Sequence, residues 1–339
     1  MISMGRQSPF TRAARIFLHS SIGVILIALF LHQIDIKGVT AQLARATLLP
    51  VLIGLIAYAL DFLLRAIRFC MLLETVTGRR LEWQRVPGPF IASFGINDLL
   101  PLRAGDAFRL LWFRQRMGFR TSDVFGAMII ERIYDLFSLL MLGFATLAWR
   151  FQSTALLLLM LSLLSCALLV PLIVKAIQKI VRARRVAESR SAGVRRIVDG
   201  LLATIGTFSI LRSPRLSFGL LVMSLLCWLL EAAVLYGAWI SLGGAWDSWA
   251  EPVAAFAAST LGTLVPGLPG HFGTFEVLGL ETFQRSGVAQ DFGAAVLVFA
   301  HILLWAPTAL FAVIWLTFTQ WGNPSGKATE QSDGLLPQG

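Results

Sequence analysis

Seven charged residues lie inside long apolar runs of this sequence, where a charge needs a chemical reason. They are Asp61, Arg65, Arg68, Glu131, Arg132, Asp135 and Glu231. Asp61 and Arg65 are four residues apart, so they share one face of a helix, and Glu131 and Asp135 have the same spacing. A charge inside a membrane helix costs about 2.5–3.5 kcal/mol on insertion scales, so such residues usually face a protein interior. Two interpretations stay open: mutual neutralisation in a packed bundle, with Arg68 reaching toward the membrane surface, or a polar cavity.

A first broken apolar stretch, residues 87–113, adds further arginines. Proline, glycine and polar residues between Asn97 and Asp106 interrupt it, which predicts two short helices joined by a turn. Arg103 and Arg109 flank Asp106, and we expect Asp106 to cap the returning helix. Because arginine binds phosphate through several N–H groups at once, these residues are candidates for an anion site.

A second broken stretch, residues 252–283, has three glycines spaced three residues apart just before another helical run. Backbone N–H groups at such a helix start can bind an anion. The alternative is a helix break that only lets neighbouring helices pack closely. The residues concerned are Gly267, Gly270, His271, Gly273 and Glu276.

Motifs typical of catalysis are missing from the sequence. It has no GxSxG, no HExxH and no Cys and His pair at metal-ligand spacing, and of its four histidines only His271 lies in a candidate site. The sequence therefore predicts no metal, no cofactor and no enzymatic activity. The sequence also lacks an ATP-binding motif. If the chain transports a substrate, that transport would therefore run downhill or be coupled to an ion gradient. Buried carboxylates make the proton a candidate coupling ion.

The composition identifies an integral membrane protein. Of 339 residues, 56% are hydrophobic and 14% charged, and the mean hydropathy is +0.73, whereas soluble domains are about 45–50% apolar and about 25% charged. A conventional soluble enzyme domain and a secreted disulfide scaffold are excluded. Six runs predict membrane-crossing helices, the first a retained anchor rather than a cleaved signal peptide. They are residues 16–34, 48–73, 124–148, 154–174, 216–242 and 292–318.

The charge distribution predicts how these helices cross the membrane. With a cytoplasmic N-terminus, 22 of the 29 Lys and Arg residues fall on the cytoplasmic side and four on the other, in agreement with the positive-inside rule. The same rule explains the net charge of +10 without a nucleic-acid partner. The basic segment 175–215 is expected to be a solvated cytoplasmic loop with a surface helix near 194–211, a face that could also hold anionic lipid.

The two broken stretches resemble each other. Pro101 and Pro266 are 165 residues apart, and so are Gly105 and Gly270. Further on, the triplet Phe-Gly-Ala at 125–127 recurs at 292–294. We therefore expect an all-α fold of about six transmembrane helices and two re-entrant helical hairpins, arranged as an inverted repeat.

The domain boundaries follow from this repeat. The first repeat would cover about residues 15–150 and the second about 153–320, within a single membrane domain at 1–320. Residues 321–339 would form a disordered tail. Both termini would lie in the cytoplasm of a bacterium, with the membrane domain in its inner membrane.

Three ordered motifs resemble one known family. They are NDLLPLRAGDAFR at 97–109, ERIYD at 131–135 and PGLPGHFGTFE at 266–276. Together they are similar to the lysylphosphatidylglycerol synthase transmembrane family, the flippase portion of the multiple peptide resistance factor. Two positions depart from the family pattern: Asp106 stands where Glu is common, and His271 stands where Gly is usual.

The resemblance covers about residues 15–320 and implies a domain that moves lipid between leaflets. In some members this domain is fused to a soluble aminoacyl transferase. Only about 20 polar residues follow the last span here, so we expect a stand-alone member that does not aminoacylate lipid. Relatives of this kind are implicated in handling various lipids, including polyprenyl-linked and hopanoid ones, so the resemblance does not choose the head group.

The leading hypothesis is a flippase for an amphipathic lipid with an anionic phosphate head. Two alternatives stay open: a membrane scaffold for a separate lipid-modifying enzyme, and an intramembrane enzyme that acts on a lipid head group through Glu131, Asp135 or His271. We expect Arg132 to face the cavity, with Glu131 and Asp135 paired to Arg65 or to a hairpin arginine. The expected lipid-binding residues are Arg65, Arg103, Asp106, Arg109, Arg132, Gly267, Gly270, His271, Gly273 and Glu276. The expected cavity or coupling residues are Asp61, Asn97, Glu131, Asp135 and Glu231.

Overall fold

The computed structural model describes residues 35–184, 213–264 and 268–319, together with residues 28, 31–32, 207–208 and 211. Every regular element in these residues is a helix, which confirms the predicted all-α class for this part of the chain. The predicted first span at 16–34 and the surface helix near 194–211 lie almost entirely outside the described residues. The tail at 321–339 lies wholly outside them.

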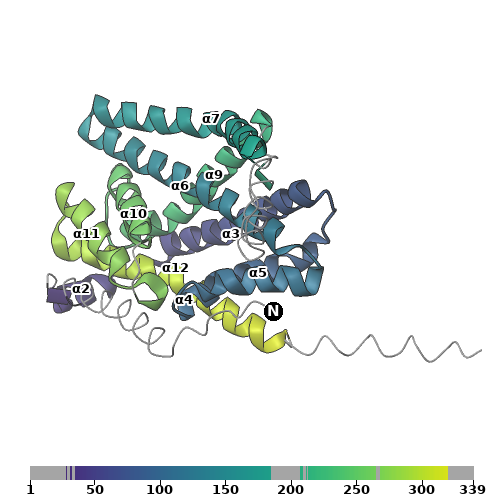
Figure 1. Cartoon of the computed structure of the whole chain (residues 1–339). Coiled ribbons are helices and arrows are strands. Elements are labelled where there is room, and N and C mark those ends of the chain that lie inside the picture. Colours follow the sequence, from purple (N-terminus) through teal and green to yellow (C-terminus); the bar gives the residue numbers. More distant parts are fainter. Residues whose placement is uncertain are drawn as a thin grey trace, which may run out of the picture.

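Five long helices form the body of the molecule (Figure 1). They are α3 (Leu48–Thr77), α6 (Thr121–Phe151), α7 (Thr154–Arg184), α9 (Pro214–Ser241) and α12 (Gln290–Phe318). At a rise of about 1.5 Å per residue, each is longer than the roughly 30 Å hydrocarbon core of a bilayer. By length and composition, α3, α9 and α12 can cross a membrane, as predicted. α6 carries three charged residues near its middle, and the apolar part of α7 is Thr154–Val170.

Two pairs of short helices stand where the sequence is broken, as predicted. Hairpin 1 consists of α4 (Pro87–Leu99) and α5 (Ala104–Met117), and hairpin 2 of α10 (Ala250–Gly262) and α11 (Thr274–Arg285). Pro87 opens α4, where its missing N–H group leaves no hydrogen bond unmade. Three minor helices complete the described part: α2 (Ile36–Leu43), η1 (Trp83–Arg85) and η3 (Pro269–His271).

Glycine lets the two helices of each hairpin approach closely. A Cβ atom at Gly105 would lie 1.8 Å from the carbonyl oxygen of Ser93, and one at Gly262 would lie 2.5 Å from the carbonyl oxygen of Thr274. Both obstacles are backbone atoms, so a larger residue would force the helices apart.

α3 and α9 run antiparallel along their length. At one end, the Thr47 N–H and hydroxyl donate to the Ser241 carbonyl, and the Ser241 hydroxyl donates to the Thr47 carbonyl at 2.7 Å. Further along, Gly54 packs against the backbone of α9, and Gly237 packs against the backbone of α3. The two helices therefore form a close central pair.

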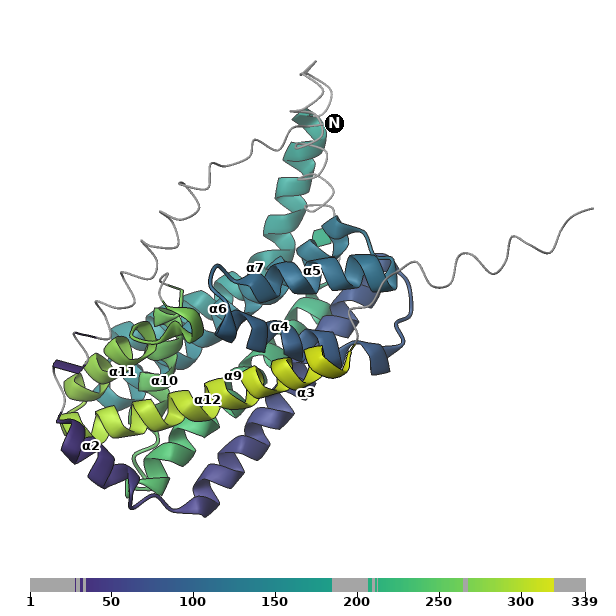
Figure 2. The ribbon, with the colours of Figure 1, turned by 90° about the horizontal axis from the view of Figure 1, so that it is seen from below.

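The hairpins pack crosswise around this pair. Hairpin 1 places α4 along α12, and hairpin 2 places α10 along α6. Each hairpin thus lies against the long helix that follows the other hairpin in the sequence. η3, at the tip of hairpin 2, contacts α4, so the tip of hairpin 2 lies beside hairpin 1 (Figure 2).

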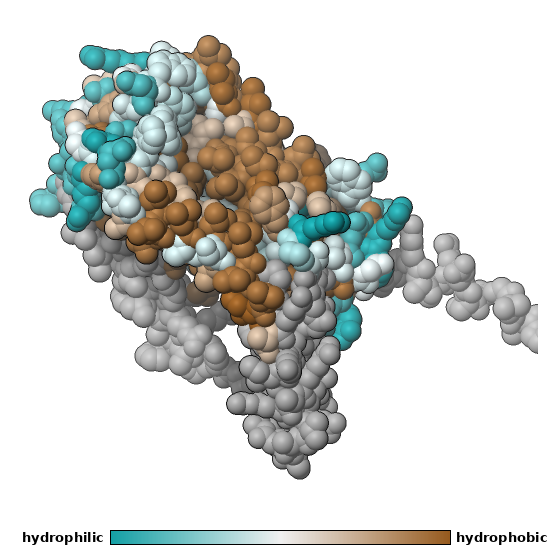
Figure 3. Space-filling view, turned by 90° about the horizontal axis from the view of Figure 1, so that it is seen from above, coloured by the Kyte–Doolittle hydropathy of each residue, from teal (hydrophilic) through white to brown (hydrophobic). Residues whose placement is uncertain are grey.

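The outer surface has the distribution of a membrane protein. Figure 3 shows hydrophobic residues over the middle of one face, with hydrophilic residues toward both ends. On α3, for example, large apolar side chains are exposed at Leu52, Ile56, Leu60 and Leu63. An apolar surface of this kind is stable against lipid and unstable in water.

Candidate functional site

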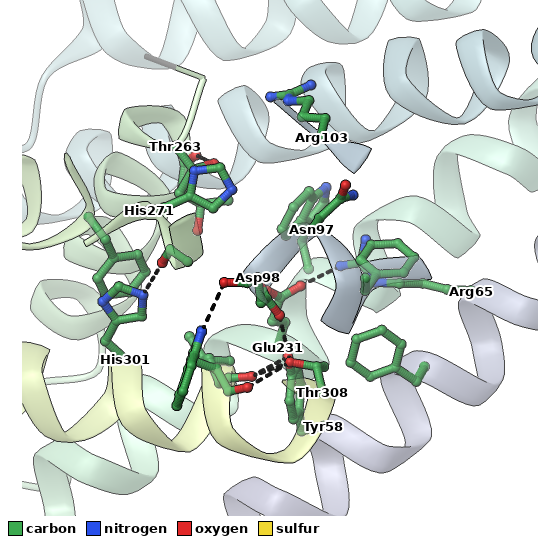
Figure 4. A pocket seen from close by; sticks show the side chains of 18 of the residues that line it. Tyr58, Arg65, Asn97, Asp98, Arg103, Glu231, Thr263, His271, His301 and Thr308 are labelled. Carbon is green, nitrogen blue, oxygen red and sulfur yellow. Dashed lines mark hydrogen bonds and ion pairs between the residues drawn. The ribbon is translucent and has the colours of Figure 1, made fainter. Parts of the chain in front are cut away.

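A cavity of about 170 Å³ lies where the tips of the two hairpins meet the long helices (Figure 4). α3, α6, α9 and α12 form its walls together with both hairpins. Its polar and charged lining residues are Tyr58, Arg65, Asn97, Asp98, Arg103, Arg132, Glu231, Thr260, Thr263, His271, His301 and Thr308. Phe62, Phe94, Trp228 and Trp305 are among the apolar ones. The cavity therefore offers charged groups and aromatic surfaces together.

The tips of both hairpins reach the cavity through strained backbone. Leu102 and Arg103 have φ values of 63° and 53°, and His271 has a φ of 61°. Residues with a side chain rarely adopt this left-handed region, and when they do, the surrounding structure must hold them there. The strain directs Arg103 and His271 to the cavity, one from each hairpin.

Asn97 holds the tip of hairpin 1 in place. Its side-chain oxygen accepts hydrogen bonds from the N–H groups of Gly105, at 2.8 Å, and Asp106, at 3.3 Å. The prediction that Asp106 caps α5 is therefore wrong: Arg103 is the N-cap residue, and Asp106 lies in the first turn. Because Asn97 satisfies the free N–H groups, the Asp106 carboxylate is available to Arg132, at 3.3 Å.

Arg65 is the most strongly paired cation of the cavity. Its Nε atom lies 2.7 Å from the Asp61 carboxylate, and its Nη2 atom donates to the Glu231 carboxylate. The guanidinium also stacks over the Trp228 ring, 4.5 Å from the centroid. Glu231 lines the cavity beside Arg65, whereas Asp61 is fully buried behind it.

Several predicted site residues lie behind the cavity rather than in its wall. Arg68 pairs with Asp135 and lies 3.5 Å from Glu131, and it is fully buried, so it does not reach toward the membrane surface. Arg109 pairs with Glu131 at 3.2 Å and packs on the rings of Phe69 and Phe90.

Arg109 was predicted to bind lipid, but its side chain is only 1% exposed and does not line the cavity. Asp61, Glu131 and Asp135 likewise do not line the cavity, since each is engaged by a buried arginine. Arg132 is the exception on its helix: it lines the cavity, and its side chain is 43% exposed. Adjacent helix residues point about 100° apart, so Arg132 and Glu131 face different surroundings.

The glycine-rich turn of hairpin 2 is only partly in the cavity wall. Gly270 and His271 line the cavity, and Gly267 lies outside the described residues. The Gly273 N–H donates to the Glu276 carboxylate at 2.7 Å, so this helix start is capped by its own side chain and is closed to an anion. Neither Gly273 nor Glu276 lines the cavity, which corrects that part of the prediction.

α12 contributes a face of the cavity that was not predicted from the sequence. His301 contacts the Glu276 carboxylate through Nδ1 and the Gly270 carbonyl oxygen through Nε2, at 2.8 Å. Thr308 donates to the Asp98 carboxylate at 2.6 Å. His301, Leu304, Trp305 and Thr308 all line the cavity, and their spacing of three, four and seven residues places them on one helix face. Polar residues at this spacing in an apolar span are a signal that could have identified this face.

A family model described as "Lysylphosphatidylglycerol synthase TM region" matches residues 16–312. The chain belongs to this family. The chain is also similar, over 320 residues, to a "UPF0104 membrane protein" of Pyrococcus horikoshii. The two are 24% identical, and the match covers 86% of this chain and 94% of the relative. The predicted family is thus confirmed.

Proposed function

We propose that this protein moves an amphipathic lipid with an anionic phosphate head between the leaflets of a bacterial inner membrane. The observation that carries the proposal is the pair Arg103 and Arg132, two exposed arginines that line one cavity, the first at the N-cap of α5 and the second in α6. Within the described part of the chain Arg103 forms no ion pair, and Arg132 forms one, with Asp106 at 3.3 Å, while its guanidinium lies 6.0 Å from the centroid of the Phe94 ring. Both guanidinium groups are thus available to bind phosphate oxygens through charge-assisted hydrogen bonds.

The aromatic wall suits the rest of such a lipid. Phe62, Phe94 and Trp305 give the cavity apolar surface next to the arginines. A cavity of about 170 Å³ accommodates a head group rather than a whole lipid. In this proposal the acyl chains stay in the bilayer while the head group crosses through the protein.

An inverted repeat supports a mechanism in which the cavity opens to either side. The order of a long helix, two short helices and another long helix occurs in α3–α6 and again in α9–α12. The hairpins would be re-entrant and enter from opposite membrane faces, and their tips meet at the cavity. Broken helices that meet near the bilayer midplane are typical of transporters built from inverted repeats.

In this proposal the protein acts as a lipid carrier and not as an enzyme. Its partners are membrane lipids, with a separate lipid-modifying enzyme as a further candidate partner that would supply or use the transported lipid. With 22 of the 29 basic residues on one side, both termini are cytoplasmic in this proposal.

The test uses the purified full chain in liposomes that contain a trace of phosphatidylglycerol with a fluorescent label. Dithionite destroys the label of the outer leaflet, and the remaining label is lost only as lipid crosses. We expect faster loss than in protein-free vesicles, and slower loss with a zwitterionic labelled lipid. An equal rate in both vesicle types, for phosphatidylglycerol and for a labelled polyprenyl phosphate, would refute the proposal.

A further inference from the structure

One connected network of ion pairs runs from the cavity into the protein interior. Consecutive members lie within 4.0 Å of each other, from Asp61 at one end to Arg132 at the other. The network contains four arginines and five carboxylates: Arg65, Arg68, Arg109, Arg132, Asp61, Asp106, Glu131, Asp135 and Glu231. When all nine are ionised, the network carries one net negative charge.

This excess matters for any anion that enters the cavity. A net charge in a low-dielectric interior is costly, and the usual remedy is the uptake of a proton. A phosphate head would bring a second negative charge to the same place. Asp98 and Arg103, which also line the cavity, add one charge of each sign and leave the excess unchanged. Neutralising a carboxylate of the network therefore favours the binding of an anionic head group.

Glu231 is the carboxylate placed for this role. Of the five in the network, only Glu231 lines the cavity, and its side chain is 18% exposed. Asp61, Asp135 and Glu131 are enclosed behind the wall, and Asp106 is held by Arg132 and Asn97. Glu231 also holds Arg65, the cavity arginine that a phosphate would compete for.

The groups around Glu231 come from every neighbouring wall of the cavity. α9 packs against α3, α6, α7, α10 and α12. The charged and titratable groups that line the cavity with Glu231, from these helices and from the two hairpin tips, are Tyr58, Arg65, Asp98, Arg103, Arg132, His271 and His301, and the charges of Asp61 and Asp135 act on Glu231 from behind the wall. From α10 and its C-cap, Thr260 and Thr263 line the cavity and do not titrate, and none of the described side chains of α7 lines it.

We propose that Glu231 takes up a proton when the lipid phosphate binds, so that proton and anionic lipid cross the membrane together as a neutral pair. The proposal rests on the proposed function. Water in the cavity delivers the proton to a carboxylate oxygen of Glu231 on the side where the lipid enters. The new hydroxyl no longer holds Arg65 by charge, and Arg65 turns its Nη2 group to the phosphate while Asp61 keeps its Nε group. On the other side the phosphate leaves, Arg65 recovers Glu231, and the proton returns to water.

The coupling has a measurable size. If one proton accompanies each singly charged lipid, a gradient of one pH unit shifts the leaflet ratio of the lipid about tenfold, because one unit corresponds to about 1.4 kcal/mol. The lipid collects in the leaflet that faces the higher pH. Because the pair is neutral, a membrane potential without a pH gradient leaves this ratio unchanged.

The experiment measures the leaflet ratio of labelled phosphatidylglycerol in proteoliposomes with an imposed pH gradient, and separately with a potassium diffusion potential. The Glu231→Gln variant keeps a neutral acceptor for Arg65 but cannot exchange a proton. We expect it to equilibrate lipid between leaflets without any response to the pH gradient. Glu281→Gln on the surface of α11 is the matched control and should respond as the unmodified protein does.

Each outcome separates this proposal from the proposed function. If the unmodified protein moves no lipid, the proposed function fails. If it moves lipid but the pH gradient has no effect, or if Glu231→Gln keeps the full response, only the proton coupling is refuted.

Asp98→Asn tests the other cavity carboxyl. Loss of the response to the pH gradient in that variant, with the response of Glu231→Gln unaffected, would assign the proton to Asp98 instead. If Glu231→Gln does not fold, a second experiment tests the proposal on the unmodified protein. Short-chain phosphatidylglycerol is added to the protein in weakly buffered detergent, and the uptake of protons is measured. No uptake there overturns the proposal.

Discussion

Arg132 and His301 occupy corresponding positions in the two halves of the chain. Each is the twelfth residue of the long helix that follows a hairpin, counted from Thr121 in α6 and from Gln290 in α12. Each contacts an acidic residue at the third position of the preceding short helix, Asp106 or Glu276. The two acidic residues are 170 positions apart in the sequence, whereas Gly105 and Gly270 in the two turns are 165 positions apart. One half thus presents a cation to the cavity, and the other an aromatic ring that anchors a hairpin tip.

Replacing Arg132 with Gln should greatly slow lipid movement while leaving the protein folded. Arg132 is half-exposed, and the one ion pair that it forms with a described residue, Asp106, is long at 3.3 Å, so its loss exposes little buried charge. A charge-assisted hydrogen bond to phosphate is worth about 1.5–3 kcal/mol, which corresponds to a decrease of about 10- to 100-fold in exchange. The dithionite assay measures the rate, and Arg285→Gln on the surface of α11 is the control. A fully active Arg132→Gln protein would contradict the assignment.

Replacing Glu131 with Gln should act mainly on stability. The Glu131 carboxylate is paired with Arg109 and Arg68, both fully buried. Breaking a buried pair leaves an uncompensated charge and costs about 3–5 kcal/mol. Unfolding followed in detergent should show a much lower midpoint than for Glu281→Gln. An unchanged midpoint would mean that water or another group satisfies these arginines.

Replacing Gly105 with Ala should disrupt hairpin 1. The added methyl group would lie 1.8 Å from the Ser93 carbonyl oxygen, so α4 and α5 would have to separate, at a cost of about 1–3 kcal/mol or more. Gly219→Ala in α9 is the matched control, because among the described residues no atom outside its own stretch of helix lies within 4 Å of the added methyl group. That change should be neutral or stabilising by up to about 1 kcal/mol, since alanine favours helix. Equal effects of the two substitutions on thermal unfolding would argue against the close packing of the hairpin.

Replacing His301 with Phe should loosen the tip of hairpin 2. The new ring can keep the contacts with Phe272 and Phe275, whose ring centroids lie 4.5 and 4.6 Å from that of His301. It cannot donate to Glu276 or to the Gly270 carbonyl, and an unsatisfied buried group costs about 1–3 kcal/mol. Hydrogen exchange of residues 268–276 should become faster, while exchange in α3 stays the same. Unchanged protection of the tip would show that the ring contacts alone hold it.

The sequence predicted most of the described fold because its signals are local. Apolar runs of sufficient length specify long helices, and Pro87, Pro101 and the glycines of both turns specify where helices stop. The same local signals placed charged residues in the membrane interior and predicted that they would need partners. The first span and the basic loop lie outside the described residues, so those predictions stay untested.

Only the tertiary structure decided which charged residues form the cavity and which stabilise the bundle. Arg103 and Arg109 lie six residues apart on one hairpin, yet Arg103 lines the cavity and Arg109 is buried against Glu131. Arg65 contacts Glu231, which is 166 residues further along the sequence. Neither local spacing nor composition indicates that these two residues are close in space. The physical reason is that spacing along a helix gives the relative directions of side chains, whereas packing between distant helices decides whether a direction faces a cavity, a partner or lipid.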